Sequence, residues 1–521
     1  MTNPSTLYRG GVLHCPADPS ATALLVSGGR IAWLGTDGDA PPADRVVDLD
    51  GALVTPAFVD AHVHATDTGL ALSGLELSGV RSAAQLLDAV AGFAAGLPAD
   101  AVVLGHGWDE SGWSDPSLPD AAALDRAAGG RRVYLSQASI HSALVSSALL
   151  AACPQAARSA GYDESGWLRR DAHHVVRAAA QGSVSRAQRV AAQRVALAHA
   201  ASLGIAAVHE CGGPEISDEE DFTGLLGISG AGLPEVYGYW GELGGAARAR
   251  ELGAVGAGGD LFADGALGSR TAHVSQPYGD GDGCGHGYLT AEQVRDHLLD
   301  CAAHGMQGGF HAIGDAAIAT VLDGFAAAAA TVGVERLRAA RHRIEHAEIM
   351  NKRLIARFVE YGVVASMQPA FDRLWGGAGR MYEARLGLDR SLESNPMGAM
   401  HSVGVALAFG SDSPVTPLDP WGSVRAAVAH HNPAQRMSVR AAFAAHTRGG
   451  WRAVHLDVEG VLALGAPATF AVWSTPAGVE RGLPVLQAED PDLRGPQDPT
   501  PLPVCRRLVL RGEVIYEEGS S

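Results

Sequence analysis

The middle of the chain repeats one pattern of hydrophobic and polar positions eight times. A short apolar run ends in polar residues at its C-terminal side, and an alanine-rich stretch with helical periodicity lies between most of the runs. The runs are residues 57–64, 205–210, 235–240, 260–265, 308–315, 342–348, 363–369 and 405–412. Strand followed by helix, eight times, predicts an α/β fold, a (β/α)8 TIM-like barrel over residues 56–454, with reactive groups at the C-terminal ends of the strands.

The gap between the first two runs is too long for a simple crossover connection. It contains two further strand-like runs, at 101–109 and 131–139, and a helical stretch from about 183 to 203. We therefore expect residues 66–203 to form an inserted α/β subdomain over the mouth of the barrel.

The two ends of the chain share a different pattern. Residues 1–55 contain short runs rich in β-branched and aliphatic residues, separated by Gly, Asp or Pro, and the same texture returns after residue 455. Together these ends predict a small β-sandwich domain composed of residues 1–55 and 455–521.

Composition narrows the classes of function. Lys plus Arg, 39, minus Asp plus Glu, 57, gives a net charge of −18, which disfavours a nucleic-acid partner. The sequence has no apolar run of 18 residues, and its first residues lack the pattern of a secretory signal, so we expect a cytoplasmic protein without a membrane partner. The six cysteines form no CxxC pair, which disfavours a disulfide framework and a cysteine zinc site.

Five residues in the predicted strands are candidate metal ligands. His62 and His64 are two apart in the first run, and residues i and i+2 of a strand point to the same side. His311 lies in the fifth run, His346 in the sixth, and Asp412 ends the eighth. Taken singly, His311 could be a core histidine and Asp412 a turn residue before a proline. Taken together, imidazoles and a carboxylate on four strands predict a site for zinc, iron or manganese.

Several segments resemble the motifs of a known family. In chain order, TPAFVDAHVH, LFADGALGSRTA, FHAIGDAAI, RHRIEHAEI and GSDSPV resemble the amidohydrolase superfamily, in particular its amidohydrolase-3 branch, which includes N-substituted formamide deformylases. The resemblance implies a β-sandwich from both chain ends beside a metal-bearing barrel, a small-molecule substrate and, at the level of the family, a homodimer. It assigns the metal centre to His62, His64, His311, His346 and Asp412.

The chain departs from this branch at one place. Many members have a lysine four residues before the aspartate of the DG motif, carboxylated so that it bridges two metal ions. Here that position is Asp260, and the only lysine of the chain, Lys352, lies on a predicted helix after the sixth run. A carboxylated-lysine bridge is therefore not expected, and the shorter aspartate is expected to have difficulty spanning two ions.

We accordingly expect one divalent ion, zinc before manganese or iron. Its ligands would be His62, His64, His311 and Asp412, with His346 nearby. The alternative is a pair of ions, with Asp260 or Glu210 as a replacement ligand.

Such a centre predicts hydrolysis of a C–N bond outside peptides, and the resemblance implies a bond of the amide or N-substituted formamide type. The ion would lower the pKa of a bound water, Asp412 would take its proton and later pass it to the leaving nitrogen, and the ion or His346 would stabilise the oxyanion. One alternative is a deaminase of an aminoheterocycle or amidine with the same groups. An alternative of another class is a catalytically silent homologue with a binding role.

Candidates for substrate contact come from the insertion and from the loops at the barrel mouth. They are Trp108, Asp109 and His141 in the insertion, and Arg270, Trp240 and Phe371 at the mouth. An aromatic residue in a long insertion more often packs in a core, so Trp108 has that alternative explanation.

Overall fold

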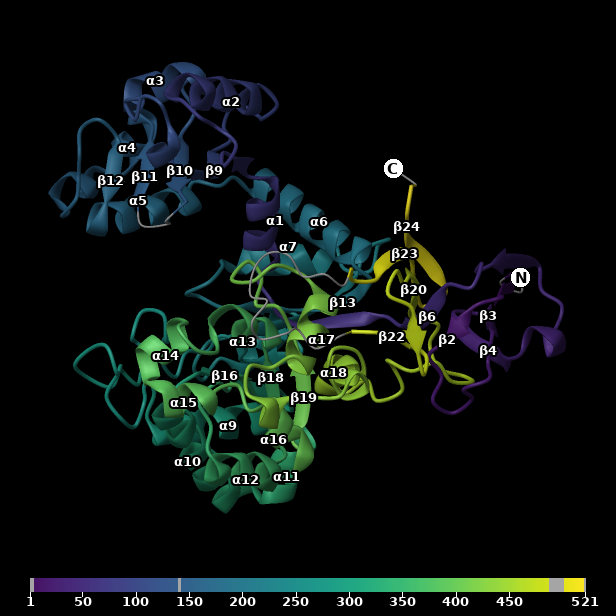
Figure 1. Ribbon diagram of the computed structural model, residues 1–521. Coiled ribbons are helices and arrows are strands. Elements are labelled where there is room, and N and C mark those ends of the chain that lie inside the picture. Colours follow the sequence, from purple (N-terminus) through teal and green to yellow (C-terminus); the bar gives the residue numbers. More distant parts are fainter. Residues whose placement is uncertain (1–3, 139–141, 487–500, 520–521) are drawn as a thin grey trace. The chain divides into compact units, whose positions relative to one another are not determined.

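The computed structural model describes residues 4–138, 142–486 and 501–519. Its largest sheet has eight parallel strands in the order β19-β18-β17-β16-β15-β14-β13-β7. The strands are Phe58–Val63 (β7), Ile205–Gly212 (β13), Glu235–Trp240 (β14), Gly256–Ala257 (β15), Gln307–Ala312 (β16), Arg343–His346 (β17), Val364–Met367 (β18) and Ala406–Phe409 (β19). The two end strands meet where Asp412 N donates to His62 O at 2.8 Å and His64 N donates to Ser413 O at 2.9 Å. The sheet is a nearly closed barrel, which confirms the predicted fold class (Figure 1).

The fourth predicted strand, at 260–265, is confirmed only in part: the named strand is β15 at Gly256–Ala257, and Phe262 pairs in parallel with His311 of β16 as an isolated bridge. The other seven coincide with barrel strands. β15 is only two residues long, and Asp260 follows it outside any strand. Gly258 and Gly259 have φ angles of 153° and 78°, and a Cβ on Gly258 would lie 2.2 Å from the backbone nitrogen of Gly309. These glycines end the strand early because they let the chain turn and approach β16 closely.

Helices follow the strands along the chain. They are Glu219–Gly227 (α7), Ala246–Glu251 (α8), Ala291–His304 (α9), Asp315–Val332 (α10), Val334–Ala340 (α11), Lys352–Tyr361 (α12), Pro369–Trp375 (α13), Met381–Leu386 (α14), Leu388–Leu392 (α15), Met397–Ser402 (α16), Pro420–Val428 (α17), Val439–Ala445 (α18) and Arg448–Ala453 (α19). α9 shows why such a helix has sharp ends: Thr290 and Gln293 form a capping box, and Gly305 closes it at φ 64°. Among the described helices, α10 is long and apolar enough to cross a membrane by length and composition; here it packs against α9 and β16.

The chain ends form two further sheets with the orders β4-β3-β1-β5 and β2-β6-β20-β23-β24. The strands are Thr6–Arg9 (β1), Val12–Leu13 (β2), Ala23–Ser27 (β3), Arg30–Gly35 (β4), Arg45–Asp48 (β5), Leu53–Pro56 (β6), Phe470–Ser474 (β20), Val504–Leu510 (β23) and Glu513–Glu517 (β24). β6 pairs antiparallel with β20, so strands from both ends share one sheet, and one apolar core contains Tyr8, Leu24 and Phe470 (Figure 1). This arrangement confirms a β-sandwich composed of both termini.

Residues Thr66–Ala196 form a compact unit of their own, and the rest of the chain forms the other. The inserted unit has one sheet, Leu75–Glu76 (β8), Val103–Trp108 (β9), Val133–Gln137 (β10), Ser142–Val145 (β11) and Trp167–Arg169 (β12), in the order β12-β11-β10-β9-β8. Its helices are Ala65–Ser73 (α1), Ala83–Ala95 (α2), Ala121–Ala127 (α3), Ser147–Ala152 (α4), Arg170–Gly182 (α5) and Arg186–Ser202 (α6), of which α1 begins and α6 ends in the other unit. The strand-like runs at 101–109 and 131–139 are confirmed as β9 and β10. The exact domain boundaries and the place of the insertion over the mouth stay predictions.

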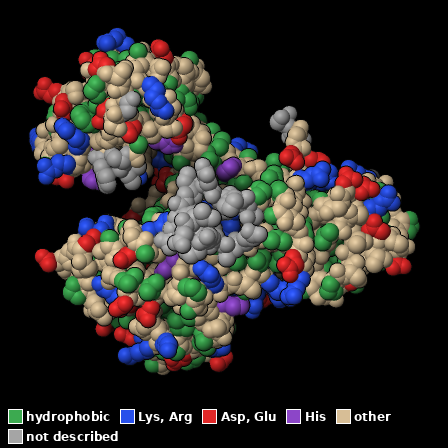
Figure 2. All heavy atoms as spheres, in the orientation of Figure 1, with side chains coloured by type: hydrophobic (Ala, Val, Ile, Leu, Met, Phe, Trp, Pro, Cys, Tyr) green, Lys and Arg blue, Asp and Glu red, His purple; other side chains and the backbone are tan. Residues whose placement is uncertain are grey.

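The surface carries charges of both signs. Figure 2 shows acidic and basic side chains interspersed over the face in view. Ion pairs of the chain include Arg341 with Asp457 and Arg357 with Asp323, each at 2.7 Å. Ion pairs with a solvent-exposed partner contribute little to stability, and the Asp323 side chain is 62% exposed.

His342 couples the stability of the barrel to pH. Its side chain is buried, and its Nδ1 accepts a hydrogen bond from Gly308 N at 2.7 Å, which joins the residue before β17 to β16. Burial, with a smaller contribution from the charge of His297, lowers the pKa of His342 to about 3. The unfolded value is about 6.5, so the unfolded chain binds this proton first, and the free energy of unfolding falls as pH drops from 6.5 towards 3.

We expect His342 by itself to remove about 2 kcal/mol of unfolding free energy between pH 7 and pH 5. Urea unfolding of the wild-type chain and of His342→Gln at both pH values measures this contribution, because glutamine keeps an acceptor but does not titrate. The variant should lose less stability than the wild type over this interval. An equal loss in both chains would contradict the assignment.

Candidate metal centre

The two histidines at the end of β7 face the same carboxylate. β7 is buried along its whole length, and the spacing of two residues directs both imidazoles to one side. Asp412 Oδ1 lies 3.5 Å from His62 Nε2 and 3.2 Å from His64 Nε2. Because β7 and β19 are neighbours at the barrel closure, these three residues meet although Asp412 lies some 350 positions along the chain from His62.

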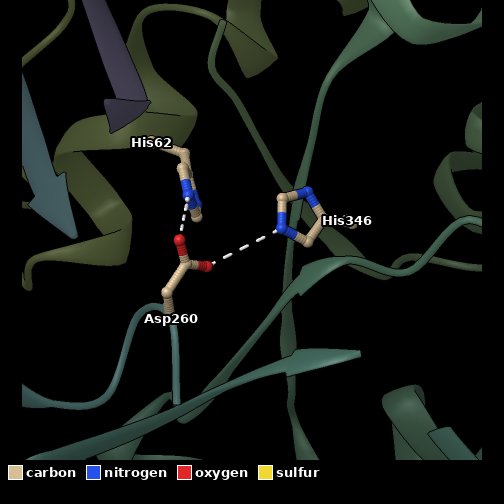
Figure 3. A group of neighbouring side chains, drawn as sticks. All are labelled: His62, Asp260 and His346. Carbon is tan, nitrogen blue, oxygen red and sulfur yellow. Dashed lines mark ion pairs between the residues drawn. The ribbon is translucent and has the colours of Figure 1, made fainter. Parts of the chain in front are cut away.

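Asp260 lies between this group and the two remaining histidines. Its Oδ2 is 3.4 Å from His62 Nε2 and 3.2 Å from His64 Nε2, whereas its Oδ1 is 3.6 Å from His311 Nδ1 and 3.8 Å from His346 Nε2. Figure 3 shows the carboxylate between His62 and His346, with one oxygen directed to each. The structure thus brings together all five predicted ligands and places Asp260 at their centre.

The expectation that Asp260 would have difficulty spanning two ions stays a prediction, although its carboxylate faces both histidine pairs. The backbone before it explains this position: the strand ends after Ala257, and the turn at Gly258–Gly259 brings the chain close to β16. A short side chain then reaches both histidine pairs.

Two of the central residues have an unusual backbone. His346 has a φ of 68° and Asp412 a φ of 57°, in the left-handed region that non-glycine residues rarely adopt. Such a conformation costs on the order of 1–2 kcal/mol for each residue and persists where the surrounding structure enforces it, most often at functional sites. The strain is consistent with side chains held for a chemical purpose.

Each of the four histidines has its second ring nitrogen bound to a hydrogen-bond acceptor. The pairs are His62 Nδ1 with Glu345 Oε2 at 2.9 Å, His64 Nδ1 with Cys211 O at 3.1 Å, His311 Nε2 with Gly265 O at 3.2 Å, and His346 Nδ1 with Gln368 Oε1 at 2.8 Å. An acceptor keeps a proton on that nitrogen, so in the neutral ring the other nitrogen presents its lone pair to the centre.

Neighbouring charges shift the pKa values of groups at the centre. Burial alone would lower the pKa of His64, but hydrogen bonds and charge from Asp260 and Asp412 raise it well above the usual value. Burial would raise the pKa of Asp260, but the charge of His62 and the nearby imidazole of His311, 3.6 Å away, hold it well below the usual value. The Asp260 carboxylate therefore stays ionised and attracts positive charge to this point.

The donor set fits a divalent metal ion. Two ligand atoms at bond lengths of about 2.0–2.1 Å and a tetrahedral angle lie about 3.4 Å apart. The contacts from His62 and His64 to Asp260 and Asp412 measure 3.2–3.5 Å. In the described part of the chain, the buried atoms His62 Nε2, Asp260 Oδ1 and His311 Nδ1 have no hydrogen-bond partner. Unsatisfied buried polar atoms are costly, and an ion bound by them would remove that cost.

A second group of metal-ligand types lies outside this centre. Asp372 accepts hydrogen bonds from the His431 ring and from His431 N, and it lies 3.2 Å from His430 Nε2. His430 Nδ1, however, accepts a hydrogen bond from Asn432 N at 3.0 Å, so the proton of His430 is on Nε2. That nitrogen has no lone pair to offer, and the group is explained as a hydrogen-bonded cluster.

Of the other predicted site residues, Glu210 is not part of the centre and Phe371 lies against it. Glu210 is buried and accepts a hydrogen bond from Ala65 N at 2.7 Å, and it belongs to none of the metal-ligand groups found among the described residues. Phe371 is buried and stacks on the His346 ring, with centroids 6.0 Å apart and planes 9° from parallel. Phe371 is therefore the predicted substrate contact that lies against the centre.

Four predicted substrate contacts have partners elsewhere. Trp108 is fully buried in the core of the inserted unit, and Trp240 is fully buried against Phe222, so the structure corrects both to packing residues. Arg270 makes two hydrogen bonds to Asp280, at 3.0 and 2.9 Å. Asp109 accepts a hydrogen bond from Ser111 N at 3.0 Å. His141 lies outside the described residues.

Sequence reasoning missed the residues that orient the histidines. Glu345 and Gln368 bind the outer nitrogens of His62 and His346, yet neither was singled out. Strand alternation directs Glu345 to the opposite side from its neighbour His346, so the motif RHRIEHAEI did not indicate that both side chains would serve the centre. No sequence pattern indicated Gln368.

Comparison with known proteins agrees with this geometry. The chain matches the model of the Amidohydrolase family (Amidohydro_3) over residues 45–516. It belongs to this amidohydrolase family. The resemblance noted from the motifs at the strand ends is thereby confirmed.

Two individual relatives of this amidohydrolase match only part of the chain, at 27% and 34% identity. The chain is 27% identical over 275 residues to the protein named amidohydrolase YtcJ of Bacillus subtilis (strain 168). The match covers 50% of this chain and 47% of YtcJ. It is 34% identical over 225 residues to LONG AFTER FAR-RED 3 of Arabidopsis thaliana, covering 41% of this chain and 38% of that protein. The matched region thus spans about half or less of the length of these relatives.

A solved structure covers more of the chain. An uncharacterized metal-dependent hydrolase from Pyrococcus furiosus superposes with a TM-score of 0.74 and 25% identity, covering 90% of this chain and 98% of the other.

Proposed function

We propose that this chain is a metal-dependent hydrolase that cleaves a C–N bond outside peptides, of the amide or N-substituted formamide type. The observation that carries the proposal is the set of His62, His64, Asp260 and Asp412 atoms 3.2–3.5 Å apart at the closure of an amidohydrolase barrel. Zinc is the ion that imidazole and carboxylate ligands at this spacing suit best, before manganese or iron.

Two ligand sets share Asp260. The first, His62, His64, Asp412 and the Oδ2 of Asp260, would hold the ion that the chemistry requires. The second, His311 and His346 with the Oδ1 of Asp260, has longer contacts of 3.6 and 3.8 Å and offers a place for a second ion. The length of the Asp260 side chain disfavoured a pair of ions, whereas its position between the two ligand sets supports that alternative.

The residues around the centre then have distinct roles. A bound divalent ion supplies an acidified water and polarises a carbonyl group. Asp412 accepts the proton of the attacking water and returns it to the departing nitrogen, which leaves poorly without one. His346 has its outer nitrogen bound to Gln368, so its inner nitrogen presents a lone pair, and this favours the role of ligand over that of oxyanion donor.

The alternatives within this proposal differ in their products. A deaminase of an aminoheterocycle or amidine would use the same groups but release ammonia from a ring carbon, whereas an amide hydrolase releases an amine and a carboxylic acid. A panel of N-substituted formamides, N-acyl amines, cyclic amides, aminoheterocycles and dipeptides separates these outcomes by product analysis. Turnover of dipeptides alone would reject the proposed bond class.

Removal of metal tests the dependence directly. Dialysis against a chelator is expected to reduce turnover of the best substrate to the uncatalysed rate, and added Zn²⁺, Mn²⁺ or Fe²⁺ should restore it. Metal analysis and a rate measurement on the same samples check this expectation. Full activity without metal would contradict it, and a chain that binds less than one ion under replete conditions would instead favour the silent homologue.

Further features of the proposal are its partners and location. A small-molecule substrate suits a centre at the end of a barrel. The net charge of −18 supports a protein without a nucleic-acid partner. We also propose that the protein is cytoplasmic and forms a homodimer.

A further inference from the structure

A buried ion pair lies directly behind His62. Arg343 and Glu345 are both fully buried, and they join through two hydrogen bonds, Nε to Oε1 at 2.5 Å and a terminal nitrogen to Oε2 at 2.8 Å. Both residues belong to β17, two positions apart, so both side chains point into the barrel.

The guanidinium group of Arg343 is held by groups from four other strands. Its terminal nitrogens lie 3.0 Å from His209 Nδ1 and donate to Ala61 O at 2.5 Å and Ser366 Oγ at 2.8 Å. The guanidinium carbon lies 4.3 Å from the centroid of the Tyr239 ring. These contacts come from β13, β7, β18 and β14, so the position of Arg343 is determined on every side.

Glu345 transmits this position to the centre. Its Oε2, which already accepts from Arg343, also lies 2.9 Å from His62 Nδ1. A carboxylate paired with arginine only accepts hydrogen bonds, so Nδ1 carries the proton and Nε2 has the lone pair. Nε2 faces Asp260 at 3.4 Å and Asp412 at 3.5 Å.

Stability alone is a poor explanation for this pair. Burial of two charges costs several kcal/mol for each ion, and well-packed apolar residues of similar volume often replace such a pair with no loss of stability. Among the four histidines, His62 has a carboxylate as its direct outer partner within 3.0 Å, whereas His64 and His311 bind backbone carbonyls and His346 binds an amide. A charged acceptor orients the imidazole and also raises its basicity as a ligand.

We propose that Glu345, held in place by Arg343, is a positioning residue that fixes His62 with its proton on Nδ1 and directs Nε2 to the metal ion. The inference rests on the proposed function only in that an ion binds there; it does not depend on which bond is cleaved. In this proposal the role of the buried Arg343–Glu345 pair is to orient a metal ligand.

Two double variants test this role without leaving an unpaired buried charge. Arg343→Met with Glu345→Gln removes both charges but keeps an acceptor for His62 Nδ1. Arg343→Met with Glu345→Leu removes the acceptor at similar side-chain volume. The measurement is the apparent dissociation constant for Zn²⁺ in competition with a chelator, with unfolding curves to show that both variants fold.

We expect the leucine variant to bind Zn²⁺ about 10–100-fold more weakly than the wild type, the loss typical of an outer partner of a metal ligand, and the glutamine variant to recover most of it. A merely structural pair would give the same affinity in both variants. Equal weakening, or no weakening in either, overturns the proposal.

A second measurement applies if a double variant does not fold. In the Zn²⁺-loaded wild type with ¹⁵N-labelled histidine, the His62 ring should have its proton on Nδ1 and the metal on Nε2. The reverse arrangement overturns the proposal, as does a wild-type chain that binds no Zn²⁺. Neither measurement needs a substrate, so a chain that binds metal and passes both tests but hydrolyses nothing in the panel rejects the proposed function alone.

Discussion

Asp412→Asn is expected to lower kcat by on the order of 10³-fold or more while the fold is retained. Asparagine is close in volume but cannot take a proton from water or deliver one to a leaving nitrogen. It keeps an oxygen beside His62 and His64, whose nitrogens lie 3.5 and 3.2 Å from Asp412 Oδ1, so metal should be partly retained. Steady-state rates and metal content of the same preparation separate these two effects.

The control for this variant is the same chemical change on the surface. Asp323→Asn removes the ion pair between the exposed Asp323 carboxylate and Arg357, and it should leave both kcat and metal content close to those of the wild type. A rate near the wild-type value for Asp412→Asn would remove Asp412 from the mechanism. Loss of rate together with complete loss of metal would show that Asp412 acts mainly as a ligand.

Asp260→Asn is expected to have the larger effect on metal binding. Asp260 is the residue whose two oxygens face His62 and His64 on one side and His311 and His346 on the other. The substitution removes the negative charge shared by all four imidazoles, so we expect the affinity for Zn²⁺ to fall by more than the 10–100-fold typical of an outer partner. Chelator competition measures the affinity, and turnover should fall with it.

Glu210→Gln is the matched comparison for Asp260→Asn. Glu210 was the other residue considered as a replacement ligand, and it accepts a hydrogen bond from Ala65 N, which glutamine can also accept. This variant should keep its metal. If Glu210→Gln loses metal and Asp260→Asn keeps it, the assignment of the central carboxylate is reversed.

The barrel could be predicted because its pattern is local. Buried parallel strands appear as short apolar runs, and helices appear as periodic stretches that close at glycines, as α9 closes at Gly305. The fourth strand was predicted only in part, because β15 is two residues long and the turn at Gly258–Gly259 separates it from Phe262, which pairs with β16 as an isolated bridge. Whether such a run pairs as a strand depends on the approach of β16, which the sequence does not display.

The predicted metal ligands are found together at the centre, whereas some of the predicted substrate contacts are not. His62, His64, His311, His346 and Asp412 all face one centre, since the ends of neighbouring parallel strands lie at the same edge of a sheet. Trp108 and Trp240 did not remain candidates for substrate contact, because the same aromatic side chain suits a pocket wall and a core.

The sequence by itself therefore determined the fold class, the two-ended β-sandwich and the identity of the candidate ligands, because strand alternation and motif order are properties of neighbouring residues. Only the tertiary structure decided that Asp260 lies between both histidine pairs and that Glu345, held by Arg343, orients His62. These contacts join separate strands of the barrel. Their distances follow from how the sheet closes and where the backbone turns, and a linear pattern contains neither.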